Sequence, residues 1–265
     1  MTAAELRTPR AHAAQGRTYR ATERDRWLLE SLGKMRFLKT GQVAKLGFEG
    51  SRWAAHKRLR KLLDAGLVRV WVRSLAEENI YSLTRRGARL AAGSDGLEQP
   101  SVPRLLDGNL DHLLGINDVR LSVALALGGE GQELLWWRSD WELRSGVRGA
   151  SVPDALFSIE IGGARRHFAL EVEHAGRSPR KFIAKILRYR SLGARLSTLY
   201  GVDDPALLVV GRDDASTERA RQSLRALPAL LRIWFASLTD IRDRGALAPI
   251  WQQVHGHERH SLRDL

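Results

Sequence analysis

Three carboxylates near the middle of the chain have the residue type and spacing of a metal-dependent phosphodiesterase. Asp154 opens the apolar stretch "ALFSIEI", and Glu171 and Glu173 close the next one, "FALEVE". Hydrolysis of a phosphodiester needs a divalent cation, which stabilises charge on the phosphate and lowers the pKa of the attacking water. Mg²⁺ takes oxygen ligands, which clustered carboxylates supply. Three interpretations follow: a nuclease site, a nuclease-derived site that no longer cuts, or an ordinary sheet with acids on its wet face.

The segments around these carboxylates predict the elements that must position them. "PDALFSIEIGG" and "ARRHFALEVEH" predict two strands joined as a hairpin by the Gly-Gly turn. Glu171 and Glu173 are two apart on a strand, so both point to one face and need a cation or a base nearby. "SPRKFIAKILRYRSLG" predicts a helix with Ser178 as N-cap, Pro179 at its first position and Gly193 near its end.

The second half of the chain alternates helices and strands. A helix in "NLDHLLGINDVRLSVALAL" precedes a short strand in "ELLWWRSDWEL", and strands in "ALLVVG" and "LRIWFASL" flank a helix in "ASTERARQSLRAL". The order helix, three strands, helix, strand predicts an α/β sandwich. With its carboxylates, this order resembles the PD-(D/E)XK nuclease superfamily. The resemblance implies that Asp154 and Glu171 bind Mg²⁺ or Mn²⁺ if the site is catalytic.

One position departs from the pattern of that superfamily. Its lysine should follow the second acid by two positions, where this chain has Glu173. Some members carry glutamate there, and others move the lysine to the next helix, where Lys185 is the candidate. The catalytic set that the resemblance implies is therefore Asp154, Glu171, Glu173 and Lys185. Because Lys185 shares a helical face with Lys181 and Arg188, a solvated basic stripe is the alternative.

Basic charge gathers in the first hundred residues. The chain has a net charge of +13. Residues 1–100 hold 20 Lys and Arg against 10 Asp and Glu, whereas the other 165 residues hold 23 against 20. A localised excess of this kind favours a polyanionic partner, and the absence of a basic amphipathic membrane helix favours nucleic acid over a membrane.

The basic part of the chain predicts a helix, a second helix, a basic third helix and a hairpin. Thr22 is the expected N-cap of the first helix, and the second covers residues 40–46. Ser51 and Gly66 bound the third helix as N-cap and left-handed C-terminal residue. "LVRVWVR" and "NIYSLT" then predict the hairpin. The stretch resembles winged helix-turn-helix regulators, which implies that the third helix enters the major groove and that the hairpin wing contacts backbone or minor groove.

The exposed side chains predicted on the third helix suit DNA. Lys57, Arg58 and Lys61 suit phosphate contact, whereas Arg52, His56 and Arg60 are expected to reach base edges, where arginine can pair with guanine. Trp53 is expected either to contact DNA or to cover the wing. The predicted DNA-binding residues are Arg52, Trp53, His56, Lys57, Arg58, Arg60, Lys61 and Arg73. The alternatives are a merely solvated helix face and a protein-interaction module.

Composition and the Gly-, Ser- and Pro-rich stretch between the two halves predict the domain organisation. We expect a flexible basic arm (1–20), a winged helix (21–90), a linker (91–104), the α/β domain (105–245) and a C-terminal tail (246–265). Cysteine is absent, which excludes disulfides and thiolate metal sites. No apolar run reaches membrane-span length and the N-terminus has no secretory core, so we expect a cytoplasmic protein associated with nucleoid or plasmid. His255, His257 and His260 indicate either a transition-metal site or a disordered tail, and we favour the tail.

The combination of these features resembles the replication-relaxation family of bacterial plasmid and mobile-element proteins. The resemblance covers about residues 25–210, and its matching positions are His112, Asn117, Asp118, Trp141, Glu142, Pro153, Asp154, Glu171, Val172, Glu173, Lys185 and Tyr189. It implies a DNA-binding protein linked to plasmid replication, relaxation or gene control. Its second acidic pair is often Glu-x-Asp, which implies a nuclease-derived core that has lost cutting.

The sequence therefore predicts an α/β (α+β) protein that binds double-stranded DNA without catalysis. The winged helix docks on the duplex in a sequence- or structure-directed way, and the nuclease-like domain supplies a second contact or forms a homodimer. DNA binding itself requires no cofactor, and no nucleotide cofactor or membrane is expected. The two alternatives are a Mg²⁺- or Mn²⁺-dependent endonuclease and a module whose basic helix meets an acidic protein.

Overall fold

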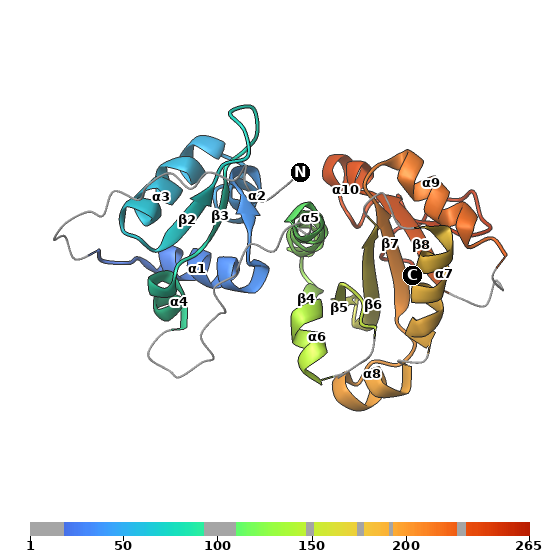
Figure 1. Ribbon diagram of the computed structural model, residues 1–265. Helices are drawn as coiled ribbons and strands as arrows, with labels where there is room; N and C mark the ends of the chain where they lie inside the picture. Colours follow the sequence, from blue (N-terminus) through green and yellow to red (C-terminus); the bar gives the residue numbers. More distant parts are fainter. Residues whose placement is uncertain (1–18, 93–109, 147–150, 174–177, 191–192, 227–231) are drawn as a thin grey trace. The chain divides into compact units, whose positions relative to one another are not determined.

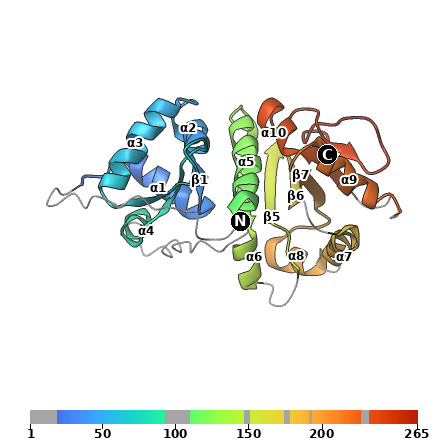
Figure 2. The ribbon, with the colours of Figure 1, turned by 45° about the horizontal axis from the view of Figure 1, so that its top comes forward.

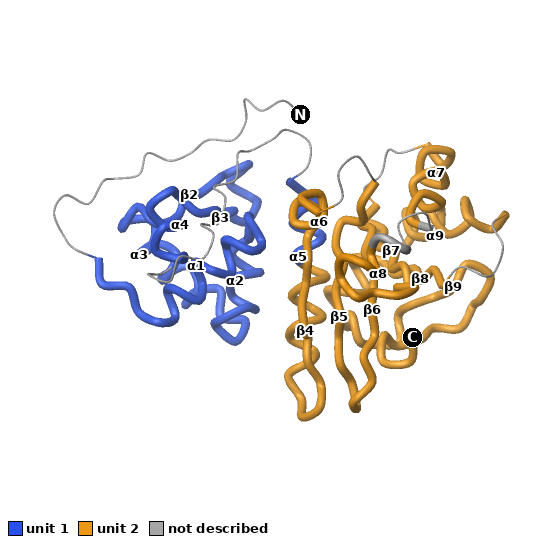
Figure 3. The backbone as a smooth tube through the Cα atoms, turned by 90° about the horizontal axis from the view of Figure 1, so that it is seen from below, with its two compact units in different colours: residues 1–117 blue, residues 118–265 orange. Residues whose placement is uncertain are grey.

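The computed structural model describes residues 19–92, 110–146, 151–173, 178–190, 193–226 and 232–265 (Figure 1). The chain forms two compact units, residues 1–117 and 118–265 (Figure 3). The described residues form 10 helices and two sheets, which confirms the mixed α/β class. No described helix has both the length and the apolar character needed to cross a membrane. Nearly all of the expected basic arm and linker lie outside the described residues.

Unit 1 combines helices with a small antiparallel sheet. Its elements are α1 (Glu23–Met35), β1 (Leu38–Lys39), α2 (Thr40–Gly47), α3 (Arg52–Asp64), β2 (Val68–Trp71), β3 (Ile80–Leu83), α4 (Arg85–Ala92) and the first part of α5 (Leu110–Ala126). β3 lies between β1 and β2 and runs antiparallel to both. The predicted order of helix, helix, basic helix and hairpin is confirmed, and β1 and α4 are additions to it.

The predicted helix boundaries of unit 1 are confirmed by their capping contacts. The Thr22 side chain accepts from the Asp25 backbone N–H, and the Asp25 carboxylate accepts from Thr22 in return. The Ser51 hydroxyl accepts from the Ala54 N–H at 3.3 Å. Gly66, just beyond α3, has φ +68°, a conformation that glycine adopts without steric cost. These contacts satisfy backbone groups that a helix end would otherwise leave unpaired.

Unit 2 is built around a six-stranded mixed sheet. Its elements after α5 are β4 (Gln132–Ser139), α6 (Asp140–Gly146), β5 (Ala155–Ile161), β6 (Ala164–Glu173), α7 (Pro179–Arg190), α8 (Gly193–Tyr200), β7 (Ala206–Gly211), α9 (Asp214–Ser223), β8 (Ile233–Ser237), α10 (Leu238–Arg244) and β9 (Gln252–Gln253). The strands lie in sequence order, β4 to β9. β4, β5 and β6 form an antiparallel meander, β6, β7 and β8 are parallel, and β9 is antiparallel to β8.

Alternating side chains divide this sheet into two apolar faces. One face packs against α7 and α9, which lie beside the strands in Figures 1 and 2, and it contributes Leu156, Ala169 and Val209 to a shared core with Phe182 of α7. On the other face Trp137 of β4 stacks on Phe157 of β5 at 4.7 Å between ring centroids. Because side chains alternate along a strand, Glu171, two positions beyond Ala169 on β6, faces α7 as well.

Two expectations for unit 2 were wrong. The helix expected to end near Gly193 is instead two helices, because α7 ends at Arg190 and Gly193 begins α8. The C-terminal tail, expected to be disordered, packs against the unit. Trp251 and Leu262 are fully buried, and the backbones of Trp251 and His260 exchange hydrogen bonds of 3.0 and 2.8 Å. Two apolar anchors in a mainly polar segment explain why its composition was misleading.

Candidate nucleic-acid interface and carboxylate cluster

The exposed face of α3 carries most of the side chains predicted to meet DNA. Ala55, Leu59 and Leu62 are fully buried against the rest of unit 1, which turns the other side of the helix to solvent. Six predicted residues are exposed there, and we call them the α3 face: Arg52, Trp53, His56, Lys57, Arg60 and Lys61. Trp53 is 72% exposed, so it does not cover the wing.

Arg58 lies on α3 but is held inside unit 1. Its Nε and Nη2 atoms each donate to the Asp25 carboxylate at 2.5 Å, and Nη2 also donates to the Thr22 hydroxyl at 2.7 Å. The Asp25 side chain is fully buried. Burial by itself would raise the pKa of Asp25, but hydrogen bonds from Arg58, Thr22 and Tyr19 lower it below its ordinary value. Arg58 therefore neutralises a buried carboxylate and joins α3 to α1.

Three other predicted arginines form ion pairs at or near the surface. Arg52 Nη1 lies 3.1 Å from Glu78 Oε1, and Arg60 Nε lies 3.2 Å from Asp64 Oδ1. Exposed pairs of this kind contribute only about 0–1 kcal/mol each, so both arginines can exchange their partners for an external anion. Arg73 differs, because its side chain is only 14% exposed and makes two hydrogen bonds to Asp111, one of them 3.0 Å long.

Lys57 and Lys61 are the cations of the α3 face that remain uncompensated. Across the described parts of the chain, neither ammonium lies within ion-pair distance of a carboxylate. The Lys57 ammonium instead lies 4.8 Å from the centroid of the Trp53 ring, a cation–π contact. Both positive charges are therefore available to an external anion.

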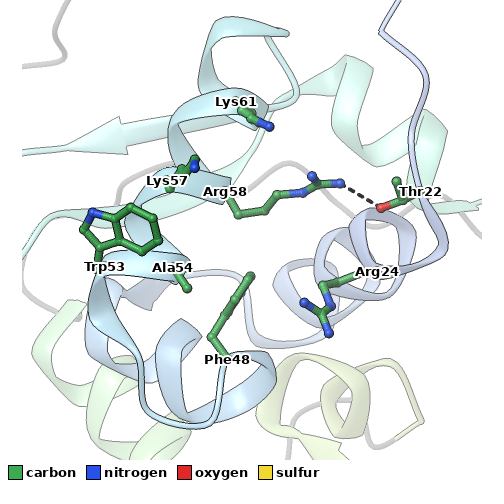
Figure 4. Close-up of a pocket in the computed structure, with 8 residues that line it drawn as sticks. All are labelled: Thr22, Arg24, Phe48, Trp53, Ala54, Lys57, Arg58 and Lys61. Carbon is green, nitrogen blue, oxygen red and sulfur yellow. Dashed lines mark hydrogen bonds between the residues drawn. The ribbon is translucent and has the colours of Figure 1, made fainter.

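A groove of about 390 Å³ lies beside the α3 face (Figure 4). Thr22 and Arg24 form the α1 side and Phe48 lies at the end of α2. From α3 the groove is lined by Trp53, Ala54, Lys57, Arg58 and Lys61. The Arg24 guanidinium lies 5.7 Å from the centroid of the Phe48 ring. We call this cavity the α3 groove.

The structure brings three of the four residues of the predicted nuclease set together in unit 2. The Lys185 ammonium of α7 bonds to Glu171 Oε1 of β6 and lies 3.7 Å from Asp154 Oδ1. Asp154 Oδ2 accepts from the Val172 backbone N–H at 2.8 Å. Tyr189, one turn beyond Lys185, donates to Glu171 Oε2 at 2.6 Å. We call Asp154, Glu171, Lys185 and Tyr189 the carboxylate cluster.

Burial makes Glu171 a weaker acid than an ordinary glutamate. Its side chain is fully buried. Desolvation and then the neighbouring Asp154 charge raise the pKa of Glu171 to about 7, although Lys185 and Tyr189 act in the opposite direction. Glu171 therefore changes its charge near neutral pH.

The cluster as arranged does not fit a divalent cation. Lys185 and Tyr189 bind the two oxygens of Glu171, and Lys185 and the Val172 N–H lie against those of Asp154. Glu173, two residues on, is also buried at the end of β6. Among the described residues, no three His, Cys, Asp or Glu side chains are grouped as metal ligands, and this includes His255, His257 and His260. The positive charge between Asp154 and Glu171 is supplied by Lys185.

A family model described as replication-relaxation matches residues 29–200, which is more than half of the chain. The chain belongs to the replication-relaxation family. Comparisons with curated proteins and with solved structures find no match. The matched span contains the whole α3 face and the whole carboxylate cluster, so both features lie within the part that this replication-relaxation protein shares with its family.

Sequence reasoning missed some partners that the fold supplies to this replication-relaxation protein. No role was predicted for Asp25, and its partner Arg58, 33 residues further along the chain, cannot be inferred from local spacing. Arg24 and Phe48 come to the α3 groove from two other elements. Tyr189 was visible as the residue one helical turn after Lys185, a spacing that places both on one face.

Proposed function

We propose that this replication-relaxation protein binds DNA through α3 and acts in the replication or relaxation of plasmid or mobile-element DNA. The observation that carries the proposal is the α3 face, where Lys57 and Lys61 project from a helix whose opposite side is buried. Uncompensated lysines of this kind suit contact with DNA phosphates, and neutralising these phosphates releases counterions from DNA. Family membership supplies the link to replication or relaxation.

The topology of unit 1 supports a winged-helix mode of docking. Its order α1, β1, α2, α3, β2, β3, with β3 between the other two strands, suits a fold in which the third helix enters the major groove. In this arrangement Lys57 and Lys61 contact phosphates, whereas Arg52, His56 and Arg60 reach base edges.

Two of the predicted DNA-binding arginines take other roles in the proposal. Arg58 is committed to buried Asp25, and Arg73 at the start of the wing loop is committed to Asp111. The wing loop also carries Glu77 and Glu78, so it adds little net positive charge. We therefore assign most of the DNA affinity to α3 rather than to the wing.

The test is the salt dependence of binding to a labelled duplex, measured by fluorescence anisotropy. Lys57→Ala with Lys61→Ala should weaken binding to all duplex sequences and reduce the slope of log K against log salt by about two, one for each lost phosphate contact. The control removes the same charge from α4, which packs against α1, through Arg85→Ala with Arg86→Ala. This control should keep the wild-type slope.

Two outcomes would contradict the proposal. Equal slopes for the lysine variant and the wild type would exclude α3 as the docking element. Absence of salt-sensitive binding to any DNA would instead favour the protein-interaction module, in which α3 meets an acidic protein.

For unit 2 we propose a role without catalysis, either as a second DNA contact or in homodimerisation. The support is the carboxylate cluster, whose oxygens are bound by Lys185, Tyr189 and the Val172 N–H. The alternative, an endonuclease that binds Mg²⁺ or Mn²⁺ through Asp154 and Glu171, requires Lys185 to leave this position first.

A further inference from the structure

The α3 groove combines excess positive charge with aromatic surface. Arg24, Lys57 and Lys61 line it, and within the described residues none of the three is within ion-pair distance of a carboxylate. The fourth cation, Arg58, is neutralised by Asp25. Trp53 and Phe48 add two aromatic rings, and Figure 4 shows the Trp53 ring beside Lys57 at one end of the groove. The ligand that fits is anionic and has a flat apolar face.

Trp53 is the exposed aromatic residue of the α3 groove, whereas Phe48 is half-buried. Trp53 is 72% exposed even though Lys57 lies over its ring, so a second planar group can reach the indole. In a perfect duplex the faces of the bases are stacked on one another, and only their edges are accessible in the grooves. An aromatic side chain can therefore stack only on a base that is unpaired or at a base step that has been opened.

We propose that the α3 groove binds an unpaired nucleotide of a DNA strand, with its base on Trp53 and its phosphates on Lys57, Lys61 and Arg24. Basic residues that track the backbone and aromatic residues that take the bases are the recurring combination in single-strand binding. A volume of about 390 Å³ suits one small ligand rather than a duplex.

Charge argues against the chain's own N-terminus as the occupant. Residues 1–18 carry three arginines and one glutamate, so this segment has the same sign of charge as the groove. The proposal rests on the proposed function, because it shares Lys57 and Lys61 with duplex docking. It adds a preference for DNA that is melted or distorted next to the duplex that α3 contacts.

The experiment compares two DNAs of the same sequence, a perfect duplex and a duplex with a short unpaired bubble, each with 2-aminopurine at the central position. The wild type should bind the bubble about five- to tenfold more tightly than the duplex, the effect of one stacked base. Binding should also quench the 2-aminopurine fluorescence of the bubble. Trp53→Ala should remove both the preference and the quenching, and should weaken binding to the bubble more than binding to the duplex.

Two further variants keep the result interpretable. Trp53→Phe retains an aromatic face and should restore most of the preference, which a merely structural role would not require. Leu125→Ala removes an apolar side chain that is 51% exposed on α5 and should behave as the wild type. Circular dichroism confirms that each variant is folded.

The outcomes separate this proposal from the proposed function. If duplex binding depends on Lys57 and Lys61 but bubble and duplex bind equally, only the groove proposal fails. It also fails if Trp53→Ala weakens both DNAs to the same extent, because Trp53 would then contact the duplex. If neither DNA binds in a salt-sensitive way, the proposed function fails as well, and an acidic peptide becomes the ligand to test.

Discussion

Replacing Lys185 by methionine tests whether its ammonium neutralises the carboxylate cluster. The side chain of Lys185 is 17% exposed, and that of its partner Glu171 is fully buried. Methionine keeps the length and apolar stem of lysine but removes the charge. Glu171 and Asp154 then face each other without a cation, and breaking a buried pair in this way costs about 3–5 kcal/mol.

The stability lost in Lys185→Met should depend on pH, and the pKa of Glu171 determines the direction of that dependence. Its pKa is raised from about 4.5 in the unfolded chain to about 7 in the folded one. The folded state therefore holds a proton that the unfolded state has released between these values. This contribution is fully present below about pH 4.5 and is lost as the pH rises to about 7, by roughly 3 kcal/mol in the wild type.

At pH 5 Glu171 is protonated with or without Lys185, so Lys185→Met should cost about 1–2 kcal/mol, for the hydrogen bond to Glu171 and the longer ion pair with Asp154. At pH 8 Glu171 is charged in the wild type, and the same substitution should cost about 3 kcal/mol or more. The double variant Lys185→Met, Glu171→Gln removes the buried charge together with its partner. It should regain much of the loss at pH 8 and show little difference between the two pH values.

Urea unfolding at pH 5 and pH 8, followed by tryptophan fluorescence, measures these differences. Five of the eight tryptophans lie in unit 2, so the signal reports on the affected part of the chain. The control is Lys181→Met, the same substitution at an exposed position one turn earlier on α7, with an expected effect within about 0.5 kcal/mol. Equal costs for the two variants at pH 8, or a pH-independent cost for Lys185→Met, would refute the reasoning.

Two further predictions concern Arg58 and the nuclease hypothesis. Arg58→Met should destabilise unit 1 by about 3–5 kcal/mol in thermal or urea unfolding because it strands buried Asp25, whereas Arg60→Met, which breaks an exposed pair, should cost at most about 1 kcal/mol. Supercoiled plasmid incubated with the protein and Mg²⁺, Mn²⁺ or EDTA should be retarded on a native gel but stay intact. Metal-dependent nicking that Asp154→Ala abolishes would instead establish an endonuclease.

Most of the fold was predictable because its signals are local. Thr22, Ser51 and Gly66 mark helix ends through contacts within a few residues, and the Gly-Gly turn fixes the hairpin of β5 and β6. The short elements were missed because packing rather than periodicity creates them. α4 is an example: a Cβ on its Gly87 would lie 2.0 Å from the Leu67 carbonyl oxygen, so its position depends on close approach to a distant backbone.

The candidate sites were predictable as residue types but not as partnerships. The acids of β5 and β6 and the lysine of α7 were identified from spacing, and the fold brings Asp154, Glu171 and Lys185 together. Sequence left Lys185 with two alternatives, a site residue or part of a basic stripe, because the choice depends on how α7 packs on the sheet. Likewise Arg58 and Lys57 are adjacent cations in sequence, and only the position of buried Asp25 separates their roles.

This separation of roles bears on how unit 1 would recognise DNA. Arg58 and Arg73 are held by carboxylates within the protein, and the uncompensated charges of the α3 face are lysines, which bind phosphate as point charges without reading sequence. In the proposed docking mode, base readout is left to His56 and to Arg52 and Arg60, which must exchange surface carboxylates for base edges. That exchange reduces the net gain at each guanine. If α3 docks on DNA as proposed, it should discriminate weakly between duplex sequences and depend more on DNA structure, which is the property that the exposed Trp53 would supply.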